Sequence, residues 1–152
     1  MWYRVFSTSE DVPRPAGLLS HLRVQGHVPR AHFRGDEEGW FGAEFILTEG
    51  TTPLHVERYL STESDVRQEL NTWAAVLETW DYDPSHLRLM QHMVSTKQVF
   101  TVRKPIDHAD EVLIDDVCVA ISRYLAACTE GVYQIDDRGF FTADGTLLIR
   151  EY

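Results

Sequence analysis

The pair His55 and Glu57 comes nearest to a chemical site in this sequence. The two residues lie two positions apart in an extended segment, and side chains with that spacing point to the same face of a sheet. An imidazole and a carboxylate placed in this way could bind a metal ion or share a proton. The alternative is a solvated strand face with a weak ion pair, which we favour. We therefore assign no catalytic, cofactor-binding or metal-binding residue from the sequence.

The other histidines and three aspartates favour structural roles. His86 and His92 are six positions apart, which places them about 120° apart around a helix and argues against a metal pair. The remaining histidines are expected at the surface or at caps: His21, His27, His32 and His108. Three aspartates near the C-terminus lack the regular oxygen pattern and final glutamate of a calcium loop, so they favour turns: Asp136, Asp137 and Asp144.

Familiar catalytic motifs are absent from the sequence. It has no phosphate-binding loop, dinucleotide-binding glycine pattern, zinc-type spacing of Cys and His, or Gly-x-Ser-x-Gly segment. Cys118 and Cys128 fall on one predicted helix, where ten residues rise about 15 Å, so a disulfide between them is excluded. We expect two buried thiols in a reducing compartment.

The composition is that of a folded, acidic protein. The 152 residues are 43% hydrophobic and 25% charged, which predicts one folded domain over residues 1–152; the element pattern described below makes that domain α+β. The formal net charge of −10 argues against binding to nucleic acid or to anionic lipid, because both require clustered Lys and Arg. The longest apolar run is too short to cross a membrane, and Met1–Phe6 lacks the apolar core of a signal peptide. We therefore expect a cytoplasmic protein.

The C-terminal third predicts a long helix followed by a β-meander. Asp107 is the predicted N-cap of this helix, and Gly131 is its predicted end. Apolar residues recur at spacings of three and four, which gives one buried stripe: Leu113, Val117, Ala120, Ile121, Tyr124, Leu125 and Cys128. Strands are predicted at 132–135, 140–142 and 146–150, with a hairpin turn at Asp144–Gly145.

The N-terminal part predicts five strands at 2–7, 28–34, 40–48, 54–60 and 96–103. In the strand 40–48, alternation predicts one face with Phe41, Ala43, Phe45 and Leu47, and the opposite face with Trp40, Gly42, Glu44 and Ile46.

Three further helices are predicted between these strands. The first covers 16–25, with Leu18, Leu22 and Val24 on its apolar side. A capping box at Thr62 and Asp65 begins the second long helix, whose buried stripe is Val66, Leu70, Trp73, Ala74 and Leu77. A short helix over 84–93 would bury Leu87, Met90 and Val94. The alternation of Leu87, Leu89, Gln91 and Met93 leaves a strand as the alternative for this segment.

These elements predict an α+β fold in which two long amphipathic helices pack on a curved, mainly antiparallel sheet. The order β-α-β-β-β occurs twice, so a duplicated module is one hypothesis. In element order, over most of the chain, the sequence resembles the vicinal oxygen chelate (glyoxalase/bleomycin-resistance) superfamily. The resemblance implies metal ligands from several strands of both modules. The strand Trp2–Ser7 offers no His or Glu, whereas Glu57, Gln98 and Glu151 fall on later strands, and we transfer no metal site.

Three functions fit these observations. The first is a non-catalytic soluble domain that binds a protein partner or another copy of itself, because catalytic motifs are lacking, the acidity is even and aromatic residues are many. The second is a small enzyme, or a binder of a small molecule or metal, with a cavity between the two modules. The third is an acidic inhibitor or immunity-like protein that covers a basic surface. We predict the first, with a homodimer as one form of it.

Overall fold

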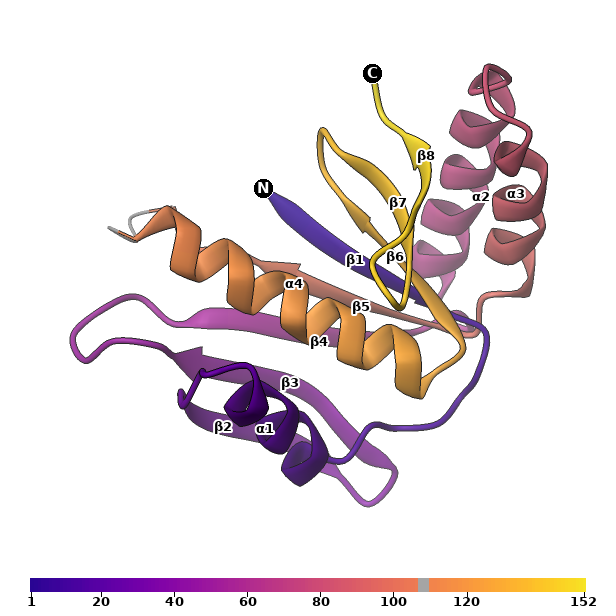
Figure 1. The fold of residues 1–152 in the computed structure, drawn as a ribbon. Coiled ribbons are helices and arrows are strands. Elements are labelled where there is room, and N and C mark those ends of the chain that lie inside the picture. Colours follow the sequence, from indigo (N-terminus) through magenta and orange to yellow (C-terminus); the bar gives the residue numbers. More distant parts are fainter. Residues whose placement is uncertain (107–109) are drawn as a thin grey trace.

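The computed structural model describes residues 1–106 and 110–152 as an α+β fold (Figure 1). Within these residues, eight strands form one antiparallel sheet that is curved and not closed: β1 (Trp2–Ser7), β2 (Arg30–Asp36), β3 (Gly39–Ile46), β4 (Leu54–Leu60), β5 (Gln98–Arg103), β6 (Gly131–Ile135), β7 (Gly139–Thr142) and β8 (Leu147–Arg150). The described helices are α1 (Pro15–Val24), α2 (Ser64–Thr79), α3 (Ser85–Ser95) and α4 (Glu111–Cys128). The predicted fold class is confirmed.

β1 is the central strand that joins the two halves of the sheet. The strand order is β2-β3-β4-β5-β1-β6-β7-β8, so β1 pairs with β5 along one edge and with β6 along the other. Val5, for example, lies opposite Phe100 of β5 and Tyr133 of β6. The backbone hydrogen bonds of β1 therefore connect the half made of β2–β5 to the half made of β6–β8.

Two apolar cores lie on opposite faces of the sheet, because successive residues of a strand point to opposite faces. Tyr3 and Val5 belong to the first core, which α1 and α4 cover (Figure 1). Phe6 belongs to the second core, which α2 and α3 cover. The helices contribute Leu18, Leu22, Val117, Ile121 and Leu125 to the first core, and Val66, Leu70, Leu77, Leu89 and Met93 to the second.

A β-bulge in β3 reverses the predicted positions of two aromatic residues. Gly35 lies opposite Trp40 and Arg34 lies opposite Gly42, so Phe41 is an extra residue without a partner in β2. Trp40 is buried in the first core, where its Nε1 donates to a backbone carbonyl at 2.7 Å. Phe41 is 48% exposed. The prediction for these two residues was wrong because alternation fails at a bulge.

The predicted buried face of α3 was also wrong. Leu89 and Met93 are buried, whereas Leu87 and Val94 are 64% and 62% exposed. Met90 is only partly buried. The short helix carries two apolar stripes, and packing against α2 selects the one that contains Leu89.

The two histidines of α3 fix this orientation by binding backbone carbonyls. His86 Nδ1 lies 3.0 Å from the carbonyl oxygen of Leu77, and His92 Nε2 lies 2.7 Å from that of Phe6. Both imidazoles thus flank the buried stripe and are partly buried, not at the surface. Burial lowers the pKa of His92, which favours the neutral ring in this position.

The ends of α4 differ in detail from the prediction. Asp110 is the N-cap, and its side chain accepts a hydrogen bond from the backbone N–H of Leu113 at 3.0 Å. Asp107, the predicted cap, lies outside the described residues. At the other end, Glu130 and not Gly131 adopts a positive φ, of 52°.

The capping box predicted for α2 does not form. Glu63 occupies the N-cap without a side-chain cap, and its carboxylate instead accepts from the N–H of Leu60 at 2.8 Å. In α1, Val24 is 83% exposed, so it does not belong to the buried side of that helix. No helix in the described part of the chain has the length and apolar content that a membrane span requires.

The strand order contradicts the hypothesis of a duplicated module. A repeat would place β2 and β6, the strands after the first and last helices, at equivalent positions. Instead β2 is the outermost strand of its half, whereas β6 lies next to the central strand β1. The two halves therefore share the order of elements along the chain but not their arrangement in the sheet.

The central position of β1 predicts a large cost for truncating Phe6. Its ring is fully buried and lies 5.9 Å from the rings of Trp73 and Phe140. We expect Phe6→Ala to lower the free energy of unfolding by about 3–5 kcal/mol in urea titrations. The matched control Phe41→Ala, at a half-exposed position, should change it by about 0.5 kcal/mol or less. Equal losses in the two variants would contradict the central role of β1.

Candidate functional site

Half of the sheet carries no helix on the face opposite α1 and α4. The second core places α2 and α3 over β6–β8 and the ends of β1, β4 and β5, where Phe6, Tyr59 and Val99 contact it. Among the described residues it includes none from β2 or β3, and from β4 only Tyr59. We call this half of the sheet, on the face opposite α1 and α4, the uncovered face. The strand registers place two rows of side chains across it: His32, Glu44, His55, Arg103 and Trp2 in one row, and Arg34, Gly42, Glu57, Thr101 and Arg4 in the next.

His55 and Glu57 both lie on the uncovered face, but they do not form a joint site. His55 Nδ1 is 3.8 Å from Glu44 Oε1 on the neighbouring strand. Glu57 accepts a hydrogen bond from the phenol of Tyr59. Within the described residues, no group of three or more His, Cys, Asp or Glu side chains is arranged to hold a metal ion. The two side chains thus have separate neighbours, as a solvated strand face would have.

A groove runs along the uncovered face on both sides of Tyr59. It consists of two hollows of about 450 and 500 Å³ that share Tyr59 and Glu63 as a common border. The first hollow lies between β4 and the turn that joins β2 to β3. The second lies between β4, β5 and the first half of α2. We call the two together the Tyr59 groove.

Six carboxylates of the described residues line the Tyr59 groove: Asp36, Glu38, Glu57, Glu63, Asp65 and Glu69. The hydrogen bond to Glu57, together with burial and the nearby carboxylates of Glu63 and Glu69, raises the pKa of Tyr59 to about 12. The phenol therefore stays protonated and donates to Glu57 at neutral pH. The six carboxylates give the groove a negative potential.

One of the two arginines lining the groove is engaged in the protein interior. Arg58 donates from Nε to Gln98 Oε1 at 2.7 Å, and burial lowers its pKa, although Asp36 and Glu38 act in the opposite direction. Arg34 lies over Gly42, where an added Cβ would meet its guanidinium at 3.0 Å. Arg4 lies beside the second hollow, with its Nε 3.7 Å from Glu69 Oε1. The residues that line the Tyr59 groove nevertheless comprise six carboxylates and two arginines.

Apolar side chains complete the lining of the Tyr59 groove. Phe41, which the bulge turns outward, is 48% exposed, and Leu60 at the end of β4 is 37% exposed. Val66 and Val99 form part of the floor of the second hollow. A bound segment would thus meet both negative charge and apolar surface.

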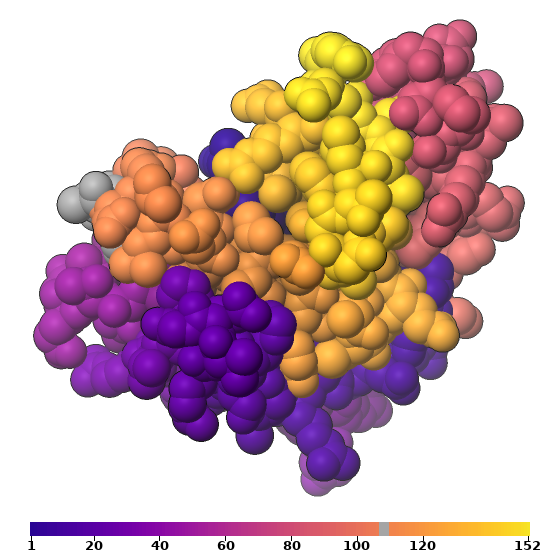
Figure 2. Space-filling model, in the orientation of Figure 1, coloured from indigo at the N-terminus to yellow at the C-terminus, as the bar shows by residue number. Residues whose placement is uncertain are grey.

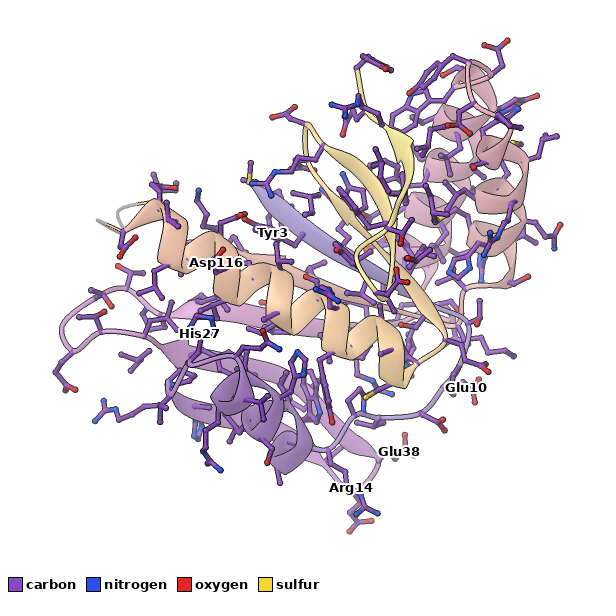
Figure 3. All side chains as sticks on the ribbon, viewed as in Figure 1. Tyr3, Glu10, Arg14, His27, Glu38 and Asp116 are labelled. Atoms are coloured by element: carbon purple, nitrogen blue, oxygen red, sulfur yellow. The ribbon has the colours of Figure 1, made fainter. Side chains whose placement is uncertain are left out.

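A second cleft lies between α1 and α4 on the opposite side of the sheet. It has a volume of about 450 Å³ and is lined by His21, Gln25, His27, Asp115, Asp116, Val119, Ala120 and Arg123. Figure 2 shows α1 and the N-terminal half of α4 adjoining on this face. In Figure 3, Asp116 on α4 and His27 after α1 lie on the two sides of the cleft. We call it the α1–α4 cleft.

A hydrogen-bonded network fixes one wall of the α1–α4 cleft. The buried Tyr3 donates to Asp115 Oδ1 at 2.5 Å, and Arg138 donates to both oxygens of the same carboxylate at 2.9 and 3.2 Å. Burial, followed by the bond to Asp115, raises the pKa of Tyr3. Asp115 is thereby committed to linking β1, α4 and the turn before β7.

The surroundings of His21 in the α1–α4 cleft shift the pKa of its imidazole. Its ring packs against that of Tyr124, with centroids 5.1 Å apart and the two planes tilted by 34°. Burial lowers its pKa below the ordinary 6.5, and the nearby Arg123 lowers it further, while a hydrogen bond to the carbonyl of Ala120 acts in the opposite direction. The cleft therefore presents a neutral imidazole at pH 7.

Of the two cysteines predicted to be buried, Cys118 is buried and Cys128 is only partly buried. Cys118 and Cys128 are both free thiols, and burial raises the pKa of Cys118. Asp136 accepts from the N–H of Trp2 at 3.0 Å, and Asp144 accepts from that of Thr146 at 3.0 Å. His108 lies outside the described residues.

Glu57, Gln98 and Glu151 lie on or next to strands for which the resemblance implies metal ligands, but their side chains do not meet at one site. Gln98 donates from Nε2 to the carbonyls of Ser9 and Asp11 at 2.8 and 2.7 Å. Glu57 points to the uncovered face, and Glu151 follows β8 and accepts from the N–H of Asp137 at 3.0 Å. The chain therefore gives no structural support for that ligand set.

The low pKa of His21 can be measured directly. We expect its imidazole to titrate below pH 6.5 by NMR, and Arg123→Gln to move this pKa upward because one positive charge is removed. His92 provides the control in the same spectra. Its pKa is also lowered by burial, but on the other face of the sheet, so Arg123→Gln should leave it in place. A wild-type pKa for His21 at or above 6.5, or no response to the substitution, would refute this description.

Comparison with known proteins adds no functional assignment to this geometry. No protein-family model, no curated protein and no solved structure matches the chain. The resemblance to the vicinal oxygen chelate superfamily therefore rests on element order alone, and the sheet arranges its two halves differently. The candidate binding surfaces of the described residues are therefore the Tyr59 groove and the α1–α4 cleft.

Proposed function

We propose that this protein is a non-catalytic interaction domain that binds a basic, amphipathic segment of a partner protein in the Tyr59 groove. The observation that carries the proposal is the combination of six carboxylates with the exposed side chains of Phe41 and Leu60 along one hollowed surface. Aromatic side chains are favoured anchors at protein interfaces, and carboxylates beside them would attract Lys and Arg.

The charge of the whole chain supports the same class of partner. A net charge of −10 attracts a basic segment over several ångströms before contact and repels acidic partners. The groove concentrates this field, because three carboxylates surround the phenol of Tyr59. The two free cysteines are consistent with a reducing, cytoplasmic location, which we include in the proposal.

A second candidate function is favoured by the α1–α4 cleft. Its neutral imidazole, His21, and the exposed carboxylate of Asp116 would suit a small polar ligand or acid–base chemistry. We rank it second because Asp115 is already committed to Tyr3 and Arg138, and Arg123 donates from Nη2 to the carbonyl of Asp144 at 2.8 Å.

Fluorescence anisotropy with a labelled peptide of alternating Lys and Leu tests the first proposal. We expect binding that weakens as salt rises, and no binding of the same peptide with Glu in place of Lys. Replacing three groove carboxylates with amides of nearly the same shape should raise the dissociation constant roughly tenfold, since each surface charge pair contributes about 0.2–1 kcal/mol. The triple variant is Glu63→Gln, Asp65→Asn, Glu69→Gln.

A control variant changes the net charge by the same amount away from the groove. It replaces three exposed glutamates: Glu49→Gln, Glu78→Gln, Glu130→Gln. This variant should bind the Lys–Leu peptide within about twofold of wild type, because its carboxylates lie outside the groove. If both triple variants weaken binding equally, the attraction is diffuse and the groove is not the site.

The ring of Phe41 is the apolar anchor of the Tyr59 groove, and its contribution can be tested separately from the charges. Phe41→Ala removes a half-exposed ring from the groove without a change in charge. We expect it to weaken binding of the Lys–Leu peptide while leaving the dependence on salt unchanged, because the number of charge contacts stays the same. Unaltered affinity would show that the aromatic side chain takes no part in recognition.

A further inference from the structure

The outer side of α3 presents an apolar stripe that the fold leaves uncovered. Leu87, Met90 and Val94 are spaced by three and four residues, a pattern typical of a buried helix face. In the structure, however, Leu87 and Val94 are 64% and 62% exposed, and Met90 is partly exposed beside them. α3 forms the outer edge of the molecule in Figure 1. Single exposed apolar residues are ordinary, whereas apolar side chains that adjoin on one helix face form a patch, and exposed apolar patches are typical of interaction sites.

The same side of α3 is poor in charge. The chain has no Asp or Glu from Pro84 to Ile106, although 24 acidic residues occur in the full sequence. The exposed residues of α3 are Leu87, Arg88, Gln91, Val94 and Ser95, of which one is charged. By contrast, the exposed positions of α2 include Asp65, Glu69 and Glu78. Protein interfaces are depleted in charge at their centre and enriched in Met and Arg.

We propose that the outer face of α3 is a self-association surface on which a second copy of this chain packs. Two molecules that each carry −10 repel one another wherever their carboxylates meet. The outer face of α3 brings no carboxylate to the contact, and its apolar stripe is complementary to itself. An acidic partner helix would find only Arg88 to pair with, so a second copy fits this face better.

A two-fold axis defines the expected contacts. In an antiparallel pair of α3 helices, Leu87 of one copy lies against Val94 of the other, and Gln91 lies close to the axis. The Tyr59 groove involves β4, β5 and the first half of α2, so it does not include these residues. A dimer formed in this way would carry two open grooves. The contact between two α3 helices does not depend on what the groove binds.

Light scattering coupled to size-exclusion chromatography tests the proposal over a range of protein concentrations. We expect the wild-type mass to rise from 17.5 kDa toward 35 kDa, which is twice 17.5 kDa. The double variant Leu87→Gln, Val94→Gln should raise the dimer dissociation constant about tenfold or more, because each loses buried apolar area at the contact. Added salt should strengthen the wild-type dimer by screening its net charge, the opposite of its effect on peptide binding in the groove.

The matched control makes the same chemical change at two equally exposed valines. Val24 and Val28 are 83% and 79% exposed and flank the turn after α1. Val24→Gln, Val28→Gln should dimerise as wild type does. The proposal is overturned if wild type stays monomeric up to about 1 mM, if the α3 variant dimerises normally, or if the control variant loses the dimer. Unchanged thermal unfolding of all variants would show that they remain folded.

Trapping a disulfide between two copies tests where the two-fold axis of the proposed dimer lies. Gln91→Cys, placed in a Cys128→Ser background, should form a covalent dimer under mild oxidation, because Cys118 is buried and Gln91 lies near the two-fold. Gln68→Cys on the exposed side of α2 is the control and should stay monomeric. Equal cross-linking at both positions would indicate random collision and would contradict an ordered α3 contact.

Discussion

The pairing of β1 with β5 and β6 at once is the constraint on which the rest of this structure depends. Six residues at the N-terminus provide the only ladder, among the described strands, between the two halves of the sheet. Their alternation also assigns the two cores, since Tyr3 and Val5 face α4 while Phe6 faces α2 and α3. A shift of one residue in this register would exchange the two faces and remove both sets of contacts.

The uncovered face exists because the four described helices pack elsewhere on the sheet. α1 and α4 fill one face, and the α2–α3 pair, which connects β4 to β5, packs over β6–β8 and only the ends of β1, β4 and β5 on the other. The strands left uncovered alternate buried apolar residues with charged ones, as at Leu54, His55, Val56 and Glu57. Their outer side is therefore stable in water without a helix. It is also free to meet a partner, and the groove beside Tyr59 gives that partner a defined place.

Local patterns allowed much of the fold to be predicted, and non-local choices account for the errors. The stripes of α2 and α4 lie within single helices, so spacing alone was sufficient to find them. Trp40 and not Phe41 is buried because of the bulge in the pairing of β3 with β2. The residues of β3 alone do not reveal that bulge. In α3 two stripes compete, and the choice is made by packing on α2. The Tyr59 groove combines residues from Asp36 to Thr101 without a motif, so spacing could not identify it.

Mapping a bound basic peptide by NMR tests the central functional claim most directly. Amide shifts of the ¹⁵N-labelled protein would be followed while a peptide of alternating Lys and Leu is added. The account predicts that the largest changes fall on β4 and the first half of α2, around Glu57, Tyr59 and Glu63. Changes centred on His21 and Asp116 in the α1–α4 cleft, or spread evenly over all acidic residues, would contradict it.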